Sequence, residues 1–236
     1  MPDAAFADPR LAPLYDVFDD DRSDLDVYAA IVDELGAHSV LDVGCGTGSL
    51  AVLLAARGID VVGVDPAAAS LDIARAKPLA DRVRWIHGDA TGLPAIAVDL
   101  ATMTGNVAQA IVDPADWAGT LGGIREALRP AGILVLETRD PARRAWEEWT
   151  REQTLRRAAG VECWQELTDV DLPLVSFRTT FLFPDAGVLT SDSTLRFRER
   201  DEVKADLARH GYELLDVRDA PDRPGRELVF VAQRRV

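Results

Sequence analysis

The strongest constraint on the fold is a glycine-rich turn between a buried strand and an apolar helix, in the segment VLDVGCGTGSLAVLLAARG at residues 40–58. Its glycines stand at alternate positions, Gly44, Gly46 and Gly48, shortly after the acidic Asp42. Glycine lets the backbone turn tightly, and it lets a ligand lie against main-chain atoms with no Cβ in the way. The segment therefore predicts a strand–turn–helix unit with a ligand at the turn.

Short apolar strands alternate with helical patterns from about residue 37 to residue 138. Near-continuous apolar strands suit a parallel sheet that helices cover on both faces. The sequence therefore predicts an α/β fold with a Rossmann-like, doubly wound and mostly parallel sheet. The expected strands are Ser39–Val43, Asp60–Val64, Arg82–His87, Asp99–Met103 and Ile133–Glu137.

The expected helices carry recognisable end signals. Asp113-Pro114 pairs an N-cap residue with a proline at the first helical position, and the helix that follows ends before Pro130. An apolar stripe over residues 25–35 predicts another helix, which Gly36 ends. Asp140-Pro141 is expected to open a further helix that contains two tryptophans, Trp146 and Trp149.

A period of two replaces the helical pattern after about residue 160. Residues 175–183 and 189–197 alternate on either side of a Pro-Asp-Ala-Gly turn, which predicts an antiparallel hairpin. Residues 161–170 are a candidate third strand of a meander. The chain then closes with a short helix and two strands, expected at Glu202–His210, Tyr212–Val217 and Glu227–Ala232. These two strands are expected to form an antiparallel pair at the edge of the main sheet.

Composition disfavours several classes of partner. The net charge of −14 argues against broad contact with nucleic-acid phosphates, which need Lys and Arg to displace counterions. Cys45 and Cys163 form no CxxC pair, so we expect neither a disulfide framework nor a metal. We find no secretory signal, and no apolar run approaches the ~20 residues that span a bilayer. These features predict a soluble, cytoplasmic protein that contacts no membrane.

A dinucleotide site is one interpretation of the glycine-rich turn. The pattern G-x-G-x-x-A at residues 46–51 fits that fingerprint, and Asp65 lies at about the right distance beyond it. The fingerprint leaves Gly44, Asp42 and a further acid, Asp89, unexplained. A methyl donor without a pyrophosphate would instead need polar groups for a methionine moiety, a ribose and an adenine.

The segment VLDVGCGTG resembles the D-x-G-x-G-x-G loop of the class I S-adenosylmethionine-dependent methyltransferases. In that family the loop wraps the methionine part of the donor. The resemblance covers residues 37–139 closely and the last helix and two strands more loosely. It implies methionine-side contacts from Asp42, Gly44, Cys45, Gly46 and Gly48.

Two further segments resemble donor-binding motifs of the same family. VVGVDPAAASLDIARAK, residues 61–77, is similar to the motif in which an acid holds both ribose hydroxyls, here Asp65 followed by Pro66. A carboxylate suits this role because its two oxygens can accept two hydroxyl protons, although Asp65 would also serve as a helix N-cap. VRWIHGDATGLP, residues 83–94, is similar to the adenine-binding motif. There the resemblance implies contacts from Asp89 and from the amide of Ala90.

MTGNVAQ, residues 103–109, resembles the segment in which the methyl group and the acceptor meet, and it supplies Thr104 and Gly105. Methyl transfer is an in-line displacement from an activated donor, so positioning and desolvation can supply most of the catalysis. A general base is needed only where the acceptor must lose a proton. We therefore assign no catalytic residue and take Tyr15, Asn106 and Arg139 as candidates for contact with the acceptor.

The sequence thus predicts one methyltransferase domain over residues 1–236. Residues 141–199 are expected to cap the acceptor site, with apolar walls from four phenylalanines: Phe177, Phe181, Phe183 and Phe197. We expect methyl transfer from S-adenosylmethionine to a small molecule, with S-adenosylhomocysteine as product and no metal. Alternatives are an RNA methyltransferase, an NAD-dependent oxidoreductase and a non-catalytic donor-binding protein. An alternative to a cap is that the hairpin within residues 141–199 forms a dimer interface or merely extends the sheet. The oligomeric state stays open, a homodimer included.

Overall fold

A seven-stranded sheet with the strand order β10-β11-β5-β4-β1-β2-β3 forms the centre of the molecule. The computed structural model describes residues 2–19, 22, 24–220 and 223–236. The strands are β1 Ser39–Val43, β2 Asp60–Asp65, β3 Val83–His87, β4 Val98–Met103, β5 Leu128–Arg139, β10 Tyr212–Asp219 and β11 Glu227–Arg234. The first five pair in parallel, whereas β11 is antiparallel to both β5 and β10. The predicted Rossmann-like sheet with its antiparallel edge pair is confirmed.

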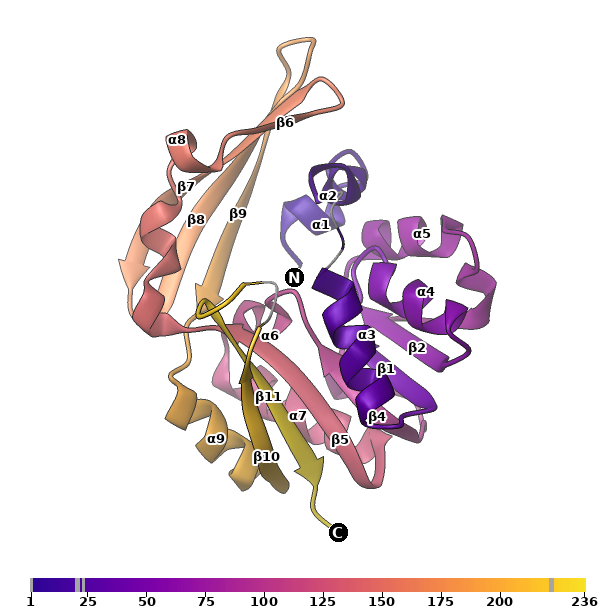
Figure 1. Cartoon of the computed structure of the whole chain (residues 1–236). Helices are drawn as coiled ribbons and strands as arrows, with labels where there is room; N and C mark the ends of the chain where they lie inside the picture. Colours follow the sequence, from indigo (N-terminus) through magenta and orange to yellow (C-terminus); the bar gives the residue numbers. More distant parts are fainter. Residues whose placement is uncertain (1, 20–21, 23, 221–222) are drawn as a thin grey trace.

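Helices cover both faces of this sheet (Figure 1). On one face α3 (Asp24–Glu34) and α4 (Ser49–Ala56) pack on alternate apolar residues of the strands. On the other face α7 (Pro114–Ala127) and α9 (Arg200–Arg209) pack on the remaining ones. A fifth helix, α5 (Ala68–Ala76), lies against β2 and β3. The carboxyl ends of the parallel strands stay clear of these layers and meet at one edge.

A separate four-stranded antiparallel sheet lies beyond that edge, between β5 and α9 in the chain (Figure 1). Its strands are β6 Arg156–Ala158, β7 Val161–Asp171, β8 Leu174–Leu182 and β9 Val188–Arg196. The hairpin of β8 and β9 and the third strand β7 are confirmed, while the short β6 was not predicted.

The helix expected from Asp140-Pro141 onward is wrong. Asp140 does cap the amide of Ala142, but the chain forms two short 3-10 turns, η3 (Pro141–Arg143) and η4 (Ala145–Glu148). Arg144 between them has a φ of 47°, a left-handed conformation that interrupts a right-handed helix. A one-turn helix, α8 (Arg151–Thr154), follows.

The N-terminal segment forms two helices that the sequence did not predict, α1 (Ala4–Ala7) and α2 (Ala12–Phe18). They lie between the four-stranded sheet and α5 (Figure 1). The remaining short elements are η1 Ala80–Arg82, η2 Ala90–Gly92 and α6 Val107–Ala110. Among the residues described, no helix combines the length and the apolar character needed to cross a membrane.

Candidate functional site

The turn between β1 and α4, residues 44–48, is called the glycine loop below. Gly44, Gly46 and Gly48 all have positive φ, at 70°, 53° and 78°. A Cβ on Gly44 would lie 2.3 Å from a methyl group of Val107, and one on Gly48 would lie 2.5 Å from the ring of Trp85. The loop therefore requires glycine both for its backbone conformation and for close packing.

Two buried carboxylates flank the glycine loop. Asp42 is 3% exposed and accepts a hydrogen bond from the Thr102 hydroxyl at 2.9 Å. Burial raises the pKa of Asp42 to about 6, and the nearby charge of Asp65 adds to the effect. Asp65 accepts hydrogen bonds from the amides of Gly46 (2.8 Å) and Ala67 (2.7 Å). Burial raises the pKa of Asp65, and these two hydrogen bonds lower it by a smaller amount. Asp65 therefore ties the glycine loop to the end of β2.

The predicted helix-cap role of Asp65 is not what the structure shows. Helix α5 begins at Ala68 and its N-cap is Ala67, so Asp65 stands before the cap. The exposed Pro66 follows Asp65. Asp65 is also paired in register with His87, the last residue of β3. The acid at the end of β2 thus faces the loop and the adjacent strand end.

Asp89 lies just beyond the end of β3, at the same edge as Asp65. It is exposed and caps η2 by accepting from the amide of Thr91 at 2.8 Å, and the adjacent Ala90 is buried. Cys45 of the glycine loop is buried, and burial raises the pKa of its thiol, so it carries no reactive thiolate at neutral pH.

The segment after β4 brings the acceptor candidates to the same edge. Gly105 and Asn106 have positive φ (63° and 67°) and follow Thr104 directly, ahead of α6. Arg139 ends β5, and its backbone amide donates to the side-chain oxygen of Gln109 in α6 at 3.4 Å. Asn106 is thus the N-cap of α6, and the end of β5 at Arg139 contacts the same short helix.

Tyr15, the third acceptor candidate, reaches this edge from α2. Its ring stacks against Phe6 at 5.9 Å, and the Arg22 guanidinium lies 5.7 Å from the ring centre. Tyr15 is also among the groups that act on the pKa of Arg139. The three candidates thus come from separate parts of the chain.

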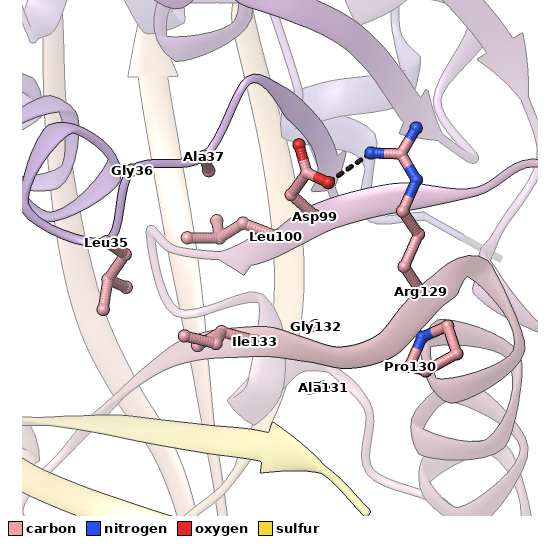
Figure 2. A pocket seen from close by; sticks show the side chains of 10 residues that line it. All are labelled: Leu35, Gly36, Ala37, Asp99, Leu100, Arg129, Pro130, Ala131, Gly132 and Ile133. Atoms are coloured by element: carbon pink, nitrogen blue, oxygen red, sulfur yellow. Dashed lines mark hydrogen bonds and ion pairs between the residues drawn. The ribbon is translucent and has the colours of Figure 1, made fainter. Parts of the chain in front are cut away.

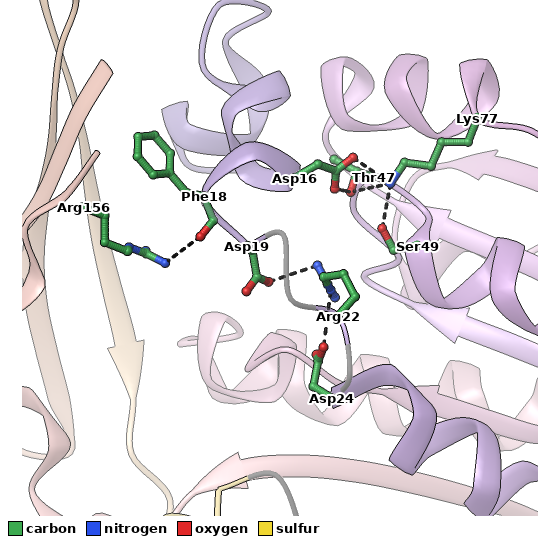
Figure 3. A network of polar contacts seen from close by, with 9 residues as sticks. All are labelled: Asp16, Phe18, Asp19, Arg22, Asp24, Thr47, Ser49, Lys77 and Arg156. Atoms are coloured by element: carbon green, nitrogen blue, oxygen red, sulfur yellow. Dashed lines mark hydrogen bonds and ion pairs between the residues drawn. The ribbon is translucent and has the colours of Figure 1, made fainter. Parts of the chain in front are cut away.

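Helix α2 is linked to the glycine loop by contacts that the sequence analysis missed (Figure 3). Asp16 pairs with the Lys77 ammonium at 2.7 Å and accepts from the Thr47 hydroxyl at 2.6 Å. Lys77 also donates to Ser49 at the start of α4, at 2.7 Å. These partners lie far apart in the sequence, and no local motif connects them.

A cavity at the opposite edge is distinct from this site. It has a volume of about 270 Å³ and lies at the amino ends of β4 and β5, where Asp99 and Arg129 form an ion pair (Figure 2). Leu35 and Ile133 supply apolar walls. No group of three or more potential metal ligands occurs among the residues that the structure describes.

Comparisons with known proteins agree with this geometry. The profile of a family described as "Methyltransferase domain" matches residues 40–132. A cypemycin N-terminal methyltransferase of Streptomyces sp is 36% identical over 109 residues, 46% of this chain but only 44% of that protein. The uncharacterized methyltransferase Rv3342 of Mycobacterium tuberculosis is 34% identical over 191 residues, 74% of this chain and 75% of that one.

A solved structure shares the fold over nearly the whole chain. It is CalS10 from Micromonospora echinaspora, an amino pentose methyltransferase with bound S-adenosylmethionine. The TM-score is 0.67 at 22% identity, and the alignment covers 91% of this chain and 93% of that one. Fold and glycine loop together define the class I S-adenosylmethionine-dependent methyltransferases. The chain belongs to this methyltransferase family, since its likeness to the mycobacterial protein spans most of both sequences.

Proposed function

We propose that this chain transfers a methyl group from S-adenosylmethionine to a small-molecule acceptor. The observation that carries the proposal is a row of acids at one edge of three adjacent strands: Asp42 in β1, Asp65 ending β2 and Asp89 beyond β3. Space for a ligand adjoins this row, because a Cβ on Gly46 or Gly105 would meet no atom within 4 Å. The residues present therefore suit the donor.

Each part of the donor has a partner in this row. The glycine loop, with Asp42 behind it, would hold the methionine part. Asp65 would accept from the ribose hydroxyls, since its two oxygens have lone pairs beyond those used by Gly46 and Ala67. Asp89 and the Ala90 amide would bind the adenine, next to Pro66.

Catalysis in this arrangement is mainly positioning. When bound, S-adenosylmethionine supplies a methyl group on a positively charged sulfur that leaves as a neutral thioether. Thr104 and Gly105 line the approach to that group, and Tyr15, Asn106 and Arg139 face the acceptor. Helix α2 and the four-stranded sheet exclude water from the same edge, which strengthens polar contacts inside.

A small acceptor is favoured over nucleic acid. The net charge of −14 opposes binding to a phosphate backbone. CalS10, which shares the fold, is named for an amino pentose, a compact polar substrate. We further propose that residues 141–199, the cap segment, select the acceptor, because they lie at the edge where the candidate residues meet.

Calorimetric titration tests the donor site directly. The wild type should bind S-adenosylhomocysteine in preference to NAD. Asp65→Ala should weaken that binding by about 1–3 kcal/mol, because ribose hydroxyls lose their acceptor in a buried site. Asp60→Ala, at the exposed start of the same strand, is the matched control and should leave the affinity unchanged. Equal binding by all three proteins, or preference for NAD, would refute the donor assignment.

Methyl transfer itself needs a separate measurement. Incubation of the wild type with methyl-labelled S-adenosylmethionine and pooled metabolites should label a small compound. Labelling of bulk RNA instead, with salt-sensitive binding, would point to an RNA methyltransferase. Donor binding without any turnover would point to a non-catalytic protein.

A further inference from the structure

The aromatic side chains of the cap segment are already used for packing. Trp146 lies 4.6 Å from Phe197 and Trp149 lies 4.7 Å from Phe177, centre to centre, in one buried cluster. Phe181 packs instead in a cluster with residues of α2. Phe177, Phe181 and Phe197 are therefore largely engaged in packing inside the protein. Polar side chains near the end of β5 are the stronger candidates for recognition of the acceptor.

Three side chains on the two elements that flank β5, α6 and β11, or at their starts, have a polar atom without a partner among the residues described. Gln109 is fully buried, and its side-chain nitrogen has no hydrogen-bond partner. The same holds for the side-chain oxygen of Asn106 and for one carboxylate oxygen of the buried Glu227. Buried polar groups are nearly always paired in folded proteins, so these exceptions indicate a polar ligand. The Gln109 nitrogen needs an acceptor, such as a carboxylate oxygen, whereas the oxygens of Asn106 and Glu227 need donors from another part of the ligand.

Arg139 lies at the centre of this region. Its backbone contacts Gln109, and it is paired in register with Glu227 across β5 and β11. The guanidinium lies over the ring of Trp149, 5.6 Å from its centre, and is half-buried. It makes no hydrogen bond or ion pair with any residue in the described part of the chain. The stacked ring leaves the N–H groups at the guanidinium edge free to donate.

The charged groups near Arg139 do not take up the hydrogen-bonding capacity of its guanidinium. Burial lowers the pKa of Arg139, whereas Glu227, Glu137 and Tyr15 act in the opposite direction. Glu227 is held by Arg223 at 2.9 Å, which itself lowers the Arg139 pKa. An arginine stays charged in proteins, so Arg139 is a half-buried cation that lies over an aromatic face, with the acids Glu227 and Glu137 near it but not hydrogen-bonded to its guanidinium.

We infer that Arg139 binds a carboxylate of the acceptor, so that the substrates are small carboxylic acids. The planar guanidinium donates two parallel hydrogen bonds in the geometry of a carboxylate, which a neutral group does not match. Gln109 supplies a further N–H donor beside it, and Trp149 orients the guanidinium. This inference rests on the proposed function, because it places the acid next to the methyl donor.

The test compares acids with their neutral amides. Wild-type protein loaded with S-adenosylhomocysteine is titrated with glycine, L-phenylalanine, D-glucuronate and 4-hydroxybenzoate, each alongside its primary amide. Binding is followed by saturation-transfer NMR, and methylation of the same compounds is measured with labelled S-adenosylmethionine. At least one acid should bind about tenfold or more tightly than its amide, since hydrogen bonds to charged groups are the strong ones.

Substitutions of Arg139 test whether its guanidinium causes the preference for the acid. Arg139→Gln should remove the preference for the acid while leaving the affinity for S-adenosylhomocysteine unchanged, and Arg139→Lys should restore part of it. Arg151→Gln is the matched control, because Arg151 also stacks on an aromatic ring, Trp164 at 4.3 Å, but is exposed on α8. It should behave as the wild type.

Two results would overturn the inference. One is a wild type that binds S-adenosylhomocysteine but prefers none of the acids to its amide. The other is an Arg139→Gln variant that weakens acid and amide equally, which would indicate a structural role. A wild type that does not bind S-adenosylhomocysteine at all would instead refute the proposed function.

Discussion

Single residues of the glycine loop differ in what surrounds them, although all three glycines share a left-handed backbone. Gly44 faces Val107 of α6 at a distance that leaves no room for a Cβ, whereas Gly46 faces open space. The first is required by packing and the second by conformation and by access to the ligand. The sequence shows a glycine at both positions, but only the structure distinguishes the packing requirement from the conformational one.

Replacing these glycines by alanine should separate the two effects. Gly46→Ala should cost about 1–2 kcal/mol in free energy of unfolding, the strain of a left-handed alanine. Gly44→Ala carries the same strain and adds overpacking, about 1–3 kcal/mol more. Urea denaturation measures both. The double variant Gly44→Ala with Val107→Ala should recover part of the loss, and an equal cost for the two single variants would contradict the packing argument.

Asp42 should give the protein a pH-dependent stability. Its pKa is raised to about 6 in the folded state, mainly by burial, and lies near 4 in an unfolded chain. Between these values the folded protein binds more protons than the unfolded chain. The free energy of unfolding therefore falls as the pH rises from about 4 to about 6.

The variant Asp42→Asn should lack this fall and should be more stable than the wild type at pH 7, by up to about 3 kcal/mol. An asparagine oxygen can still accept from Thr102, so the buried hydrogen bond is retained. Urea denaturation between pH 4 and pH 7 measures the difference. Parallel pH profiles would show that Asp42 is not the group responsible.

At the scale of elements, the long periodic segments were predictable and the short ones were not. Each predicted strand is found within two residues at each end, except that β5 begins at Leu128 instead of Ile133. The helix expected after Asp140 fails because the left-handed Arg144 interrupts it, and an arginine gives no sign of that in the sequence. The helices α1 and α2 depend on contacts with distant elements, which local patterns do not encode.

The residues of the candidate site likewise fall into those that the sequence predicted and those that it did not. The glycine loop and the acids Asp42, Asp65 and Asp89 could be placed near one edge from order and spacing, because parallel strands end at one edge. Lys77, Asp16 and Gln109 act through partners elsewhere in the chain and were not recognised. The period-two alternation of the cap segment showed which face is apolar but not what covers it, and the structure packs Phe177, Phe181 and Phe197 against other aromatic and apolar side chains.

Helix α6 depends on one buried arginine. Arg198 is 2% exposed and donates to the carbonyls of Ala108 and Ile111, at 2.6 Å each, while it stacks over Trp117 at 4.2 Å. Arg198→Met should cost about 2–5 kcal/mol in free energy of unfolding, because one buried and one partly buried carbonyl lose a charged donor. It should also weaken donor binding, since α6 carries the Val107 that packs on the glycine loop.

Denaturation and calorimetry on the same variant test both effects. Arg196→Met is the control: its ion pair with Glu202, at 3.2 Å, is more exposed and should contribute less than about 1 kcal/mol. A loss of stability with unchanged affinity for S-adenosylhomocysteine would show that α6 does not support the glycine loop.

At the scale of the whole molecule, α2 joins the two sheets across the candidate site. On one side Asp16 binds Lys77 and Thr47 beside the glycine loop. On the other side the Arg156 guanidinium of β6 donates to the carbonyl of Phe18 at 3.1 Å (Figure 3). Both of these links are polar and partly exposed, and on the side of the four-stranded sheet Leu14 of α2 also packs in an apolar cluster with Phe181. The attachment of α2 to the glycine loop therefore depends more on polar contacts than its attachment to the four-stranded sheet. A ligand beneath it would have to enter through the side that α2 covers.

Breaking the link to the glycine loop should therefore loosen α2 without unfolding the sheet. In Asp16→Asn the ion pair with Lys77 is lost, and a partly buried pair of this kind contributes about 1 kcal/mol. Amide hydrogen exchange in α2 should then accelerate about fivefold, while exchange in β1, β4 and β5 stays as in the wild type. Arg10→Gln, which removes an exposed ion pair with Asp8 between α1 and α2, is the control and should leave α2 unchanged. S-adenosylhomocysteine should slow exchange in α2 of the wild type more than in the variant. Equal acceleration throughout the main sheet would mean that Asp16 supports the fold as a whole and that α2 is not a separately opening cover.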